Sequence, residues 1–405
     1  MEFQQEKLEN GLQIIGEVNP AAKSAAVGFF VKTGSRDETS AVSGVSHFLE
    51  HMLFKGTDRR TAMEVNAAFD DTGAQFNAFT SEENTVYYAS VLPEYLDEVT
   101  SLWSDLMRPA LRDDDFDMEK NVIKEEIAMY KDMPSFDVMD RCRTLFFGEH
   151  PCGNSVLGTA QSIDDLSSAQ MREYFARRYA PNNIVVAFAG HFDWERMVSL
   201  TQDRCRQWDP HDLARETSHF AGRVDHARLG QAGLAREHLC LMSEGVSYQD
   251  PQHYAAMLLS SIVGDSAGSR YFWELVDKAV AEAASMSLDG MDGTGSMVSY
   301  VRCSPERATE VLDVLQSIFE TLARAGVTKE ELRMAKNKTL SALVIKNELP
   351  MGRLIDLGFN WTYLQEYRQV EKDVTEIKSV TVEDVNKMIE RLKPGVFTRY
   401  QIGPD

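Results

Sequence analysis

The chain has 405 residues, of which 43% are hydrophobic, 26% are charged and 9% are aromatic, and its length predicts more than one domain. These fractions are typical of soluble globular proteins and exclude collagenous, wholly disordered and disulfide-scaffold proteins. The 42 Lys and Arg residues are outnumbered by 63 Asp and Glu residues, and the resulting net charge of −21 argues against nucleic acid as a partner and favours basic peptides.

The beginning of the chain carries no visible targeting signal. Residues 1–7 are polar and acidic, whereas a secretory signal needs a basic start and an apolar stretch, so we expect a cytoplasmic protein. The longest apolar runs, such as residues 25–31, are far shorter than the roughly 18 residues of a membrane span, so no membrane partner is expected. The five Cys residues are scattered and form no Cys-x-x-Cys pair, which indicates reduced, buried thiols.

Strands and helices are mixed in the first half of the chain. In chain order, the hydrophobic patterns predict a strand at 25–30, a helix at 42–54, a strand at 85–89, helices at about 93–107 and 113–131, a helix at 165–179 and a strand at 183–190.

The second half repeats part of this pattern. The helix-break-helix segment that begins at Pro93 and ends near Lys120 has a counterpart that begins at Pro305 and ends near Lys336, an offset of 212 residues at the start and 216 at the end. The helix at 380–392 likewise corresponds to the earlier helix at 165–179. We therefore predict an α+β fold of two homologous halves, each a mostly antiparallel sheet flanked by helices. The predicted bounds are 1–210, a linker at 211–232, and 233–405.

The residues best suited to bind a metal ion lie in the helix predicted at 42–54, which contains His47-Phe48-Leu49-Glu50-His51. Histidines four residues apart lie on one helical face and can hold one ion, and Glu50 can reach a water on that ion without being a ligand. The alternative is a set of hydrogen-bonded core side chains. Each of these polar groups would cost about 1–3 kcal/mol if it were left unpaired in an apolar helix, and a metal ion removes that cost.

A third ligand must come from elsewhere, because catalytic zinc sites typically use three protein ligands and a water. The helix at 113–131 offers Glu119, Glu125 and Glu126. Glu119 and Glu126 are two turns apart on a face that we also expect to hold Val122, whereas Glu125 points closer to water. This facial argument favours Glu126 or Glu119 and leaves both open. Co²⁺ and Mn²⁺ also suit such ligands, but zinc is the expected ion.

The motif His47-x-x-Glu50-His51, followed by Met52-Leu53-Phe54-Lys55-Gly56-Thr57 and by Glu126 75 residues after His51, resembles the pitrilysin-type inverzincin peptidases. This family includes the mitochondrial processing peptidase and insulin-degrading enzyme. The resemblance covers essentially the whole chain and is to the short, two-domain kind, in which two chains pair around a chamber. It implies a zinc-binding catalytic domain at 1–210 and a metal-free domain at 233–405.

The same resemblance implies roles for individual residues. The zinc ligands would be His47, His51 and Glu126, with Glu119 supporting them and Glu50 as the general base that activates a zinc-bound water. The implied function is a zinc metalloendopeptidase, a hydrolase that cleaves peptide bonds.

The stretch 73–80 resembles the family's substrate-binding edge strand, with Asn77 and Ala78 beside the scissile bond. Pairing with an edge strand reads the backbone of a peptide more than its side chains. The expected substrates are therefore extended or unfolded peptides.

The second half departs from the family pattern. After residues 269–272 the family has a helix that supplies an arginine and, seven residues later, a tyrosine, and both stabilise the substrate's oxyanion. This chain has Val276 and Ala283 at those places, and neither side chain can donate a hydrogen bond. Loss of such donors costs about 10²–10³ in rate, so a homodimer of this chain is expected to be a poor enzyme.

Three interpretations follow from these departures. The chain could act as a homodimeric peptidase, as a catalytic subunit that is active only with a related partner supplying the missing Arg and Tyr, or as a non-catalytic assembly or peptide-binding protein of the same fold. Glu119 and Glu126 correspond to Ala335 and Ala342 in the repeat, so the second half is expected to hold no metal.

Overall fold

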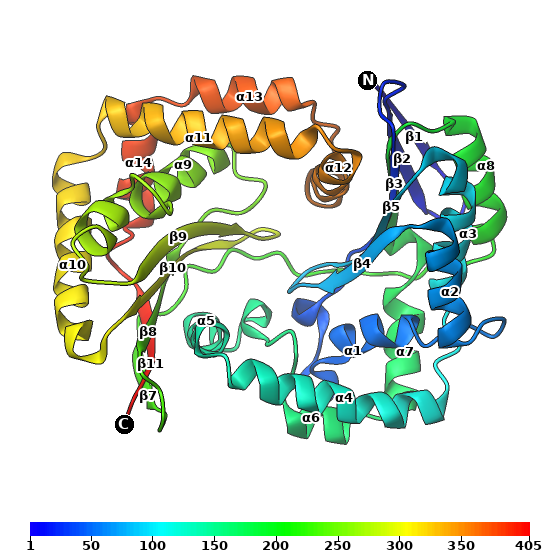
Figure 1. Cartoon of the computed structure of the whole chain (residues 1–405), viewed down its shortest axis with the longest axis horizontal. Helices are drawn as coiled ribbons and strands as arrows, with labels where there is room; N and C mark the ends of the chain where they lie inside the picture. Colours follow the sequence, from blue (N-terminus) through cyan, green and yellow to red (C-terminus); the bar gives the residue numbers. More distant parts are fainter. The chain divides into compact units, whose positions relative to one another are not determined.

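The computed structural model describes all 405 residues, which form two compact units. Unit 1 comprises residues 1–127, 154–215 and 344–368, and unit 2 comprises residues 128–153, 216–343 and 369–405. Each unit contains one sheet and several helices (Figure 1). The predicted α+β class is therefore confirmed.

The sheet of unit 1 has six strands in the order β1-β2-β6-β3-β5-β4. The strands are β1 (Glu2–Lys7), β2 (Gln13–Val18), β3 (Ala25–Val31), β4 (Gln75–Thr80), β5 (Thr85–Val91) and β6 (Ile184–Gly190). All neighbouring strands are antiparallel except β2 and β6. Every residue of β3 and β6 is buried, as expected for central strands, and β4 lies at one edge.

Helices cover both faces of this sheet. They are α1 (Val45–Leu53), α2 (Ala62–Thr72), α3 (Leu96–Leu106), α6 (Ala160–Asp165), α7 (Ser168–Arg178), α8 (Trp194–Cys205) and α12 (Pro350–Leu364). Leu354 and Leu357 of α12 pack with Phe30 and Val86 in one buried cluster. Gly358 lets α12 approach this closely, because a Cβ there would lie 2.1 Å from the Phe30 ring.

The sheet of unit 2 has five strands in the order β7-β11-β8-β10-β9. They are β7 (His226–Gly230), β8 (Glu237–Glu244), β9 (Ala283–Gly290), β10 (Gly295–Cys303) and β11 (Thr398–Gly403). The helices of this unit are α5 (Pro134–Phe147), α9 (His253–Gly264), α10 (Ala308–Ala325), α13 (Val370–Ser379) and α14 (Val382–Leu392). Two long helices, α4 (Asp113–Lys131) and α11 (Lys329–Asn347), cross from one unit to the other.

The two sheets repeat one topology. The order β2-β6-β3-β5-β4 matches β7-β11-β8-β10-β9 position by position, and within each of these five-strand orders only the first pair is parallel. Helices α4 and α11 are both 19 residues long and begin 216 residues apart, at Asp113 and Lys329. The duplication inferred from the sequence is therefore also present in the strand order.

The compact units are not continuous in sequence, because corresponding helices are exchanged. Helix α5 follows α4 in the first half of the chain, yet it belongs to unit 2, where Cys142 and Phe146 pack with Met242 and Ile402. Its counterpart α12 follows α11 and belongs to unit 1. The bounds 1–210 and 233–405 thus describe halves of the sequence, whereas the compact units interleave.

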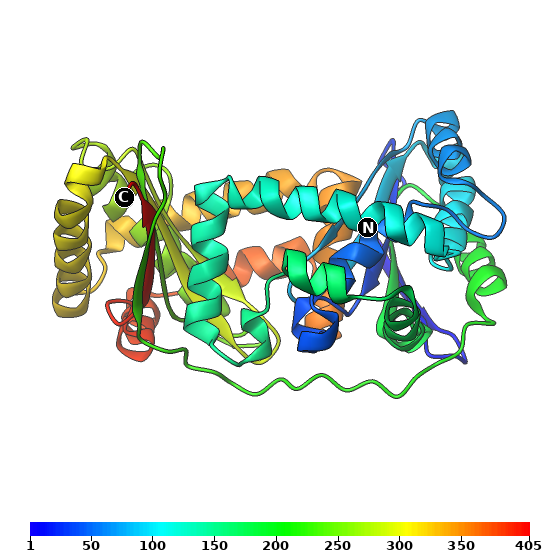
Figure 2. The ribbon, with the colours of Figure 1, turned by 90° about the horizontal axis from the view of Figure 1, so that it is seen from below.

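The segment between the sequence halves is extended. Residues 208–225 contain no helix or strand and form a long loop (Figure 2). The last part of the segment expected to be a linker, residues 226–230, forms β7 and pairs with β11.

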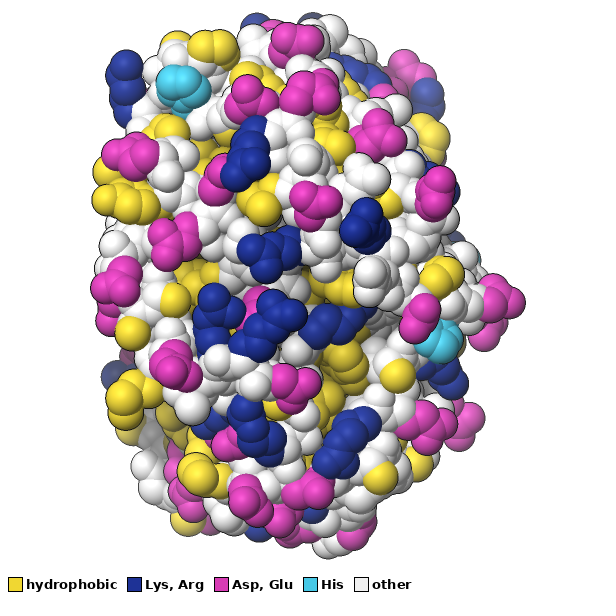
Figure 3. Space-filling model, turned by 90° about the vertical axis from the view of Figure 1, so that its right-hand side faces the viewer, with side chains coloured by type: hydrophobic (Ala, Val, Ile, Leu, Met, Phe, Trp, Pro, Cys, Tyr) yellow, Lys and Arg dark blue, Asp and Glu magenta, His cyan; other side chains and the backbone are white.

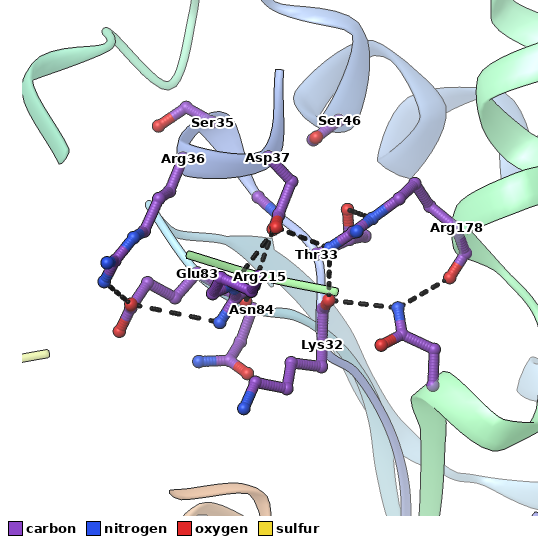
Figure 4. A network of polar contacts seen from close by, with 12 residues as sticks. Lys32, Thr33, Ser35, Arg36, Asp37, Ser46, Glu83, Asn84, Arg178 and Arg215 are labelled. Atoms are coloured by element: carbon purple, nitrogen blue, oxygen red, sulfur yellow. Dashed lines mark hydrogen bonds and ion pairs between the residues drawn. The ribbon is translucent and has the colours of Figure 1, made fainter. Parts of the chain in front are cut away.

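Buried ion pairs fix this segment and α7 to unit 1. Asp37 lies 2.5 Å from both Arg178 and Arg215, and Glu83 lies 2.6 Å from Arg36 (Figure 4). These side chains are at most 6% exposed. Because buried charges are costly unless paired, this cluster fixes the position of Arg215, the last residue of unit 1 before the chain enters unit 2.

The surface is less uniformly acidic than the net charge suggests. On the side of unit 1 that carries α3 and α8, Lys and Arg side chains gather in the middle of the face, with Asp and Glu side chains around them (Figure 3). No helix combines the length and the apolar character that crossing a bilayer requires.

Candidate metal centre

Helix α1 carries His47, Glu50 and His51, and its position is set at its amino terminus. The helix begins at Val45 rather than at residue 42, because Gly44 adopts a left-handed conformation with φ of 89°. The Glu38 carboxylate accepts hydrogen bonds from the backbone N–H groups of Gly44 (2.6 Å) and Ser46 (2.7 Å). Burial outweighs these bonds and raises the pKa of Glu38 to about 7.

The structure brings His47, His51 and Glu126 together. One Glu126 oxygen, Oε2, lies 3.4 Å from Nε2 of His51 and 3.7 Å from Nε2 of His47. One ligand atom from each residue lies within 4.8 Å of the others. Zinc bonds of about 2.0–2.2 Å in a tetrahedron require ligand atoms about 3.3 Å apart, and the two distances to Glu126 are already close to this value.

The two imidazoles differ in their electrostatics. Burial, and then the charge of His51, lower the pKa of His47 to about 3, so His47 is neutral with a lone pair available for a metal. Its Nδ1 is buried without a hydrogen-bond partner, and its Nε2 is the ring nitrogen that faces Glu126. Burial also lowers the pKa of His51, but its hydrogen bond to Glu119 and the charges of Glu126, Glu119 and Glu50 outweigh burial and raise it overall.

Glu119 orients His51. Its Oε1 lies 2.9 Å from Nδ1 of His51, and its other oxygen forms an ion pair with Lys55, which follows α1. Burial raises the pKa of Glu119, but the hydrogen bonds from His51 and Lys55 outweigh it and lower the pKa overall. Holding Nδ1 in this way leaves Nε2 of His51 directed at Glu126, the arrangement that carboxylates next to metal-binding histidines usually produce.

Glu50 lies next to the three ligand candidates without belonging to their group. Its Oε2 accepts a 2.6 Å hydrogen bond from the Thr80 hydroxyl at the end of β4. Burial is the largest cause of the raised pKa of Glu50, and it exceeds the opposing effects of Thr80 and His51. A carboxylate with a raised pKa is suited to taking up and releasing a proton.

Asn77 and Ala78 lie on β4, at the open edge of the sheet. The Asn77 side chain is exposed, and its Oδ1 accepts the N–H of Ala78 at 2.8 Å. The Ala78 N–H is therefore directed away from the ladder with β5. Since backbone groups alternate in direction along an antiparallel strand, the same open edge presents the backbone groups of Phe76 and Thr80.

Helix α4 contacts unit 1 through a narrow stripe of buried side chains, Phe116, Glu119, Ile123 and Ile127. Glu125 is exposed, and Glu126 is half-buried at the border of the stripe. The expectation that Val122 shares the ligand face is wrong, because its side chain is 45% exposed. Val122 is one residue, about 100° of helical rotation, from Ile123, and that step turns it to solvent.

Three contributors were not found from the sequence. Thr80 lies at the end of the stretch 73–80, but no sequence pattern pairs it with Glu50. Lys55 is four residues after His51, a spacing that could have suggested a contact on one side of the helix. Glu38 gives no sequence signal, because its role as a cap depends on a loop that folds back on the start of α1.

Unit 2 lacks the corresponding groups. Val276 ends a short π-helix (Phe272–Val276) and Ala283 begins β9, so the expectation that one helix carries both positions is wrong. The positions on α11 that correspond to Glu119 and Glu126 are Ala335 and Ala342, which offer no ligand atom. All five Cys side chains are free and buried, as the sequence predicts.

Comparison with known proteins gives a consistent result. Residues 13–160 match the family model described as Insulinase (Peptidase family M16), and residues 165–339 match the model described as Peptidase M16 inactive domain. An uncharacterized zinc protease of Mycobacterium leprae (strain TN) is 33% identical over 413 residues, covering 98% of this chain and 91% of the relative. An uncharacterized zinc protease of Bacillus subtilis (strain 168) is 29% identical over 388 residues, covering 95% and 94%.

Among solved structures, a protease from Helicobacter pylori superposes with a TM-score of 0.92 at 21% sequence identity, covering 100% of this chain and 99% of that one. At this level of identity the similarity establishes a common fold.

Proposed function

The chain belongs to the insulinase family of peptidases, family M16, as its motifs predict, and on this premise we propose that it is a zinc metalloendopeptidase acting on extended peptides. The observation that supports this proposal most directly is the convergence of His47, His51 and Glu126 from two helices, with Glu50 beside them. A non-catalytic scaffold would have no physical need for a partly buried ligand set together with an adjacent general base.

The side chains of the site can perform the proton transfers of peptide hydrolysis. A bound Zn²⁺ would supply polarisation of the substrate carbonyl and a water of lowered pKa. Glu50 accepts the proton that the attacking water loses and then donates it to the nitrogen of the leaving amine. Thr80 holds one oxygen of Glu50 at 2.6 Å, and Glu119 holds the His51 ring, so both groups are oriented before a substrate binds.

The open edge of β4 suits a peptide substrate. An extended peptide pairing with this edge would replace the internal hydrogen bond between Ala78 and Asn77 with an intermolecular one. Thr80, which contacts Glu50, lies on the same strand two residues later, so a paired peptide would pass next to the general base. Most segments of a folded protein already use their backbone groups in internal hydrogen bonds, which supports a preference for unfolded chains.

Substitution of Glu50 tests the proposal. The Glu50→Gln variant is expected to keep its fold and its zinc content while peptide cleavage falls by at least about 10²–10⁴, the usual contribution of a general base. Zinc content is measured by elemental analysis and cleavage with a quenched fluorescent peptide library. Glu125→Gln makes the same chemical change on the exposed side of α4 and is expected to cleave normally. Equal turnover by Glu50→Gln and the unmodified chain would exclude Glu50 as the base.

A second candidate is favoured by Val276 and Ala283, which stand where the family has an arginine and a tyrosine. We propose that full activity requires a related partner chain that supplies these donors. Activity of the purified chain should then rise by about 10²–10³ with such a partner or in the double variant Val276→Arg, Ala283→Tyr. Full turnover by the purified chain alone would contradict this requirement.

A further inference from the structure

A second feature of the β4 edge lies on the face opposite to the metal centre. Side chains alternate along β4, and Phe76, Ala78 and Thr80 point toward α1: Thr80 contacts Glu50, and the Phe76 ring stacks on Phe69 of α2 with 3.9 Å between centroids. Gln75, Asn77 and Phe79 therefore point to the other face, where Phe79 meets Phe359 of α12.

This other face contains an open pocket of about 570 Å³. It lies between the first half of β4, the neighbouring part of β5 and the start of α12, with Gln75, Asn77, Tyr88, Ser90, Leu349 and Met351 among its lining residues. Its volume falls within the range of about 300–1,000 Å³ that is usual for small-ligand sites. The pocket belongs entirely to unit 1.

The pocket is uncharged in a strongly acidic protein. None of its twelve lining residues is Asp, Glu, Lys, Arg or His, although the chain has a net charge of −21. Two of the lining residues are aliphatic side chains that expose much of their surface, Leu349 at 67% and Leu92 at 52%. Covering exposed apolar surface of this kind with another apolar group is favourable, because it removes both from water. A charged group placed in the pocket would lose hydration without gaining a charged partner.

A peptide paired with β4 would reach this pocket. Gln75 and Asn77 of the edge strand line the pocket, and the register places Ser90 and Tyr88 of β5 opposite them, so the pocket extends inward from the edge strand over one face of the sheet. Alternate side chains of an added strand project to the two faces of the sheet, one toward α1 and the next toward α12. Asn77 is one residue and Gln75 three residues from Ala78, which corresponds to about 3 to 10 Å along the strand at about 3.3 Å per residue.

We propose that this pocket is a specificity subsite that receives one uncharged, apolar side chain of the peptide, at a fixed position within about four residues of the cleaved bond, and that Leu349 is its main specificity-determining residue. This proposal rests on the proposed peptidase function, because it assumes that a peptide substrate pairs with β4 and passes Glu50. It adds a side-chain preference to a strand interaction that otherwise reads only the backbone.

Binding can be measured without turnover. The full chain carrying Glu50→Gln is loaded with zinc and titrated with fluorescein-labelled decapeptides in which each position in turn is Leu, Phe, Ala, Lys or Asp. Fluorescence polarisation gives the dissociation constants. Leu or Phe at one position is expected to bind about 10- to 100-fold more tightly than Ala, Lys or Asp there, the range that burying one such side chain provides.

The variant Leu349→Lys tests the assignment. It should weaken binding of the Leu peptide about tenfold and change binding of the Ala peptide by less than about twofold. Ile345→Lys is the matched control, because Ile345 is 66% exposed, lies four residues earlier and does not line the pocket. Leu349 makes no side-chain capping bond to α12, so its replacement leaves the helix start intact.

The outcomes separate the two proposals. No binding, no preferred position, or the same preference in Leu349→Lys as in Ile345→Lys would overturn the subsite. Peptide cleavage by the chain with Glu50 intact, but without the apolar preference, would overturn the subsite and leave the peptidase function standing. A preference that depends on Leu349 would support the subsite, and it would overturn the peptidase function if cleavage were also absent with a related partner and in the double variant Val276→Arg, Ala283→Tyr.

Discussion

His51 is the side chain of the candidate metal centre that faces the most neighbouring charge. Three carboxylates, Glu50, Glu119 and Glu126, act on it, whereas His47 is so buried that its pKa is about 3. Without a metal ion, a proton on His51 balances part of this negative charge. A divalent cation at Nε2 would take over that role, so metal and proton compete for one imidazole.

This competition predicts the pH dependence of zinc binding. The pKa of His51 is raised above its usual 6.5. Zinc affinity should be constant at pH values well above the pKa of His51 and should fall about tenfold per pH unit below that pKa, because each bound ion then displaces one proton from His51. His47 should add a second proton only near pH 3. Calorimetry in buffers of different ionisation enthalpy measures the proton count. Release of two protons near pH 6 would contradict these assignments.

Glu119 should affect metal affinity more than its distance from the ion suggests. In Glu119→Gln the amide cannot hold His51 Nδ1 with a charged acceptor, and Lys55 loses its ion-pair partner. Zinc affinity is expected to fall about 10- to 100-fold. Competition with a chelating dye measures it, and Asp117→Asn, on the same helix, serves as the control. Unchanged affinity would show that Glu119 does not position His51.

At the scale of elements, the chemistry depends on two helices and an edge strand meeting correctly. Helix α1 is only nine residues long, and it ends before Lys55. Short helices gain little stability by themselves, so α1 is held by its surroundings. The Glu38 cap fixes its beginning, the Thr80–Glu50 hydrogen bond joins it to β4, and the His51–Glu119 contact joins it to α4.

Removal of the α1 cap should therefore destabilise the protein in a pH-dependent way. Glu38→Ala leaves two buried N–H groups unsatisfied and is expected to lower the free energy of unfolding by about 2–3 kcal/mol at pH 5. The folded-state pKa of Glu38 is raised to about 7, so its contribution is complete below about pH 4.5 and declines as pH rises through 7. The effect of the substitution should thus be smaller at pH 8.

Urea unfolding at both pH values measures this difference. Thr61→Ala removes the exposed cap of α2 and serves as the control, with an expected loss of about 1 kcal/mol and little change with pH between 5 and 8. A larger effect of Glu38→Ala at pH 8 than at pH 5 would contradict the raised pKa.

At the scale of the whole molecule, the exchange of α5 and α12 makes each compact unit depend on both halves of the sequence. Helix α12 is held in unit 1 by apolar packing and by a buried ion pair between Arg353 and Glu17 of β2, 2.8 Å apart. Tyr367 adds a 2.6 Å hydrogen bond to Glu17. Unit 1 therefore cannot be completed by the first half of the chain alone.

Breaking this ion pair should be costly. Arg353→Met leaves the Glu17 carboxylate buried without its counterion and is expected to lower the free energy of unfolding by about 3–5 kcal/mol. Arg333→Met removes an arginine from an exposed pair with Glu330 on α11 and should cost less than about 1 kcal/mol. Chemical denaturation compares the two variants, and equal effects would show that the buried pair does not hold α12.

Much of the fold could be predicted from the sequence. The predicted strand at 25–30 and helix at 113–131 agree with β3 and α4 to within a residue, because hydrophobic periodicity is strong in both. The helix predicted at 42–54 begins three residues late, since Gly44 takes a left-handed conformation that periodicity does not report. The exchange of α5 and α12 could not be predicted, because their sequences show an apolar face without showing which sheet covers it.

The sequence by itself determined what lies within one element: two histidines and a glutamate on a single helical face, and two glutamates two turns apart on another helix. Helical geometry fixes such relations over four to seven residues, whatever the rest of the fold does. Only the tertiary structure decided that Glu126 faces the histidine pair while Glu119 contacts Nδ1 of His51. It also decided that Thr80 contacts Glu50 and that α12 borders the pocket beside β4. These relations join residues far apart in the chain, and they arise from the packing of helices and sheet against one another.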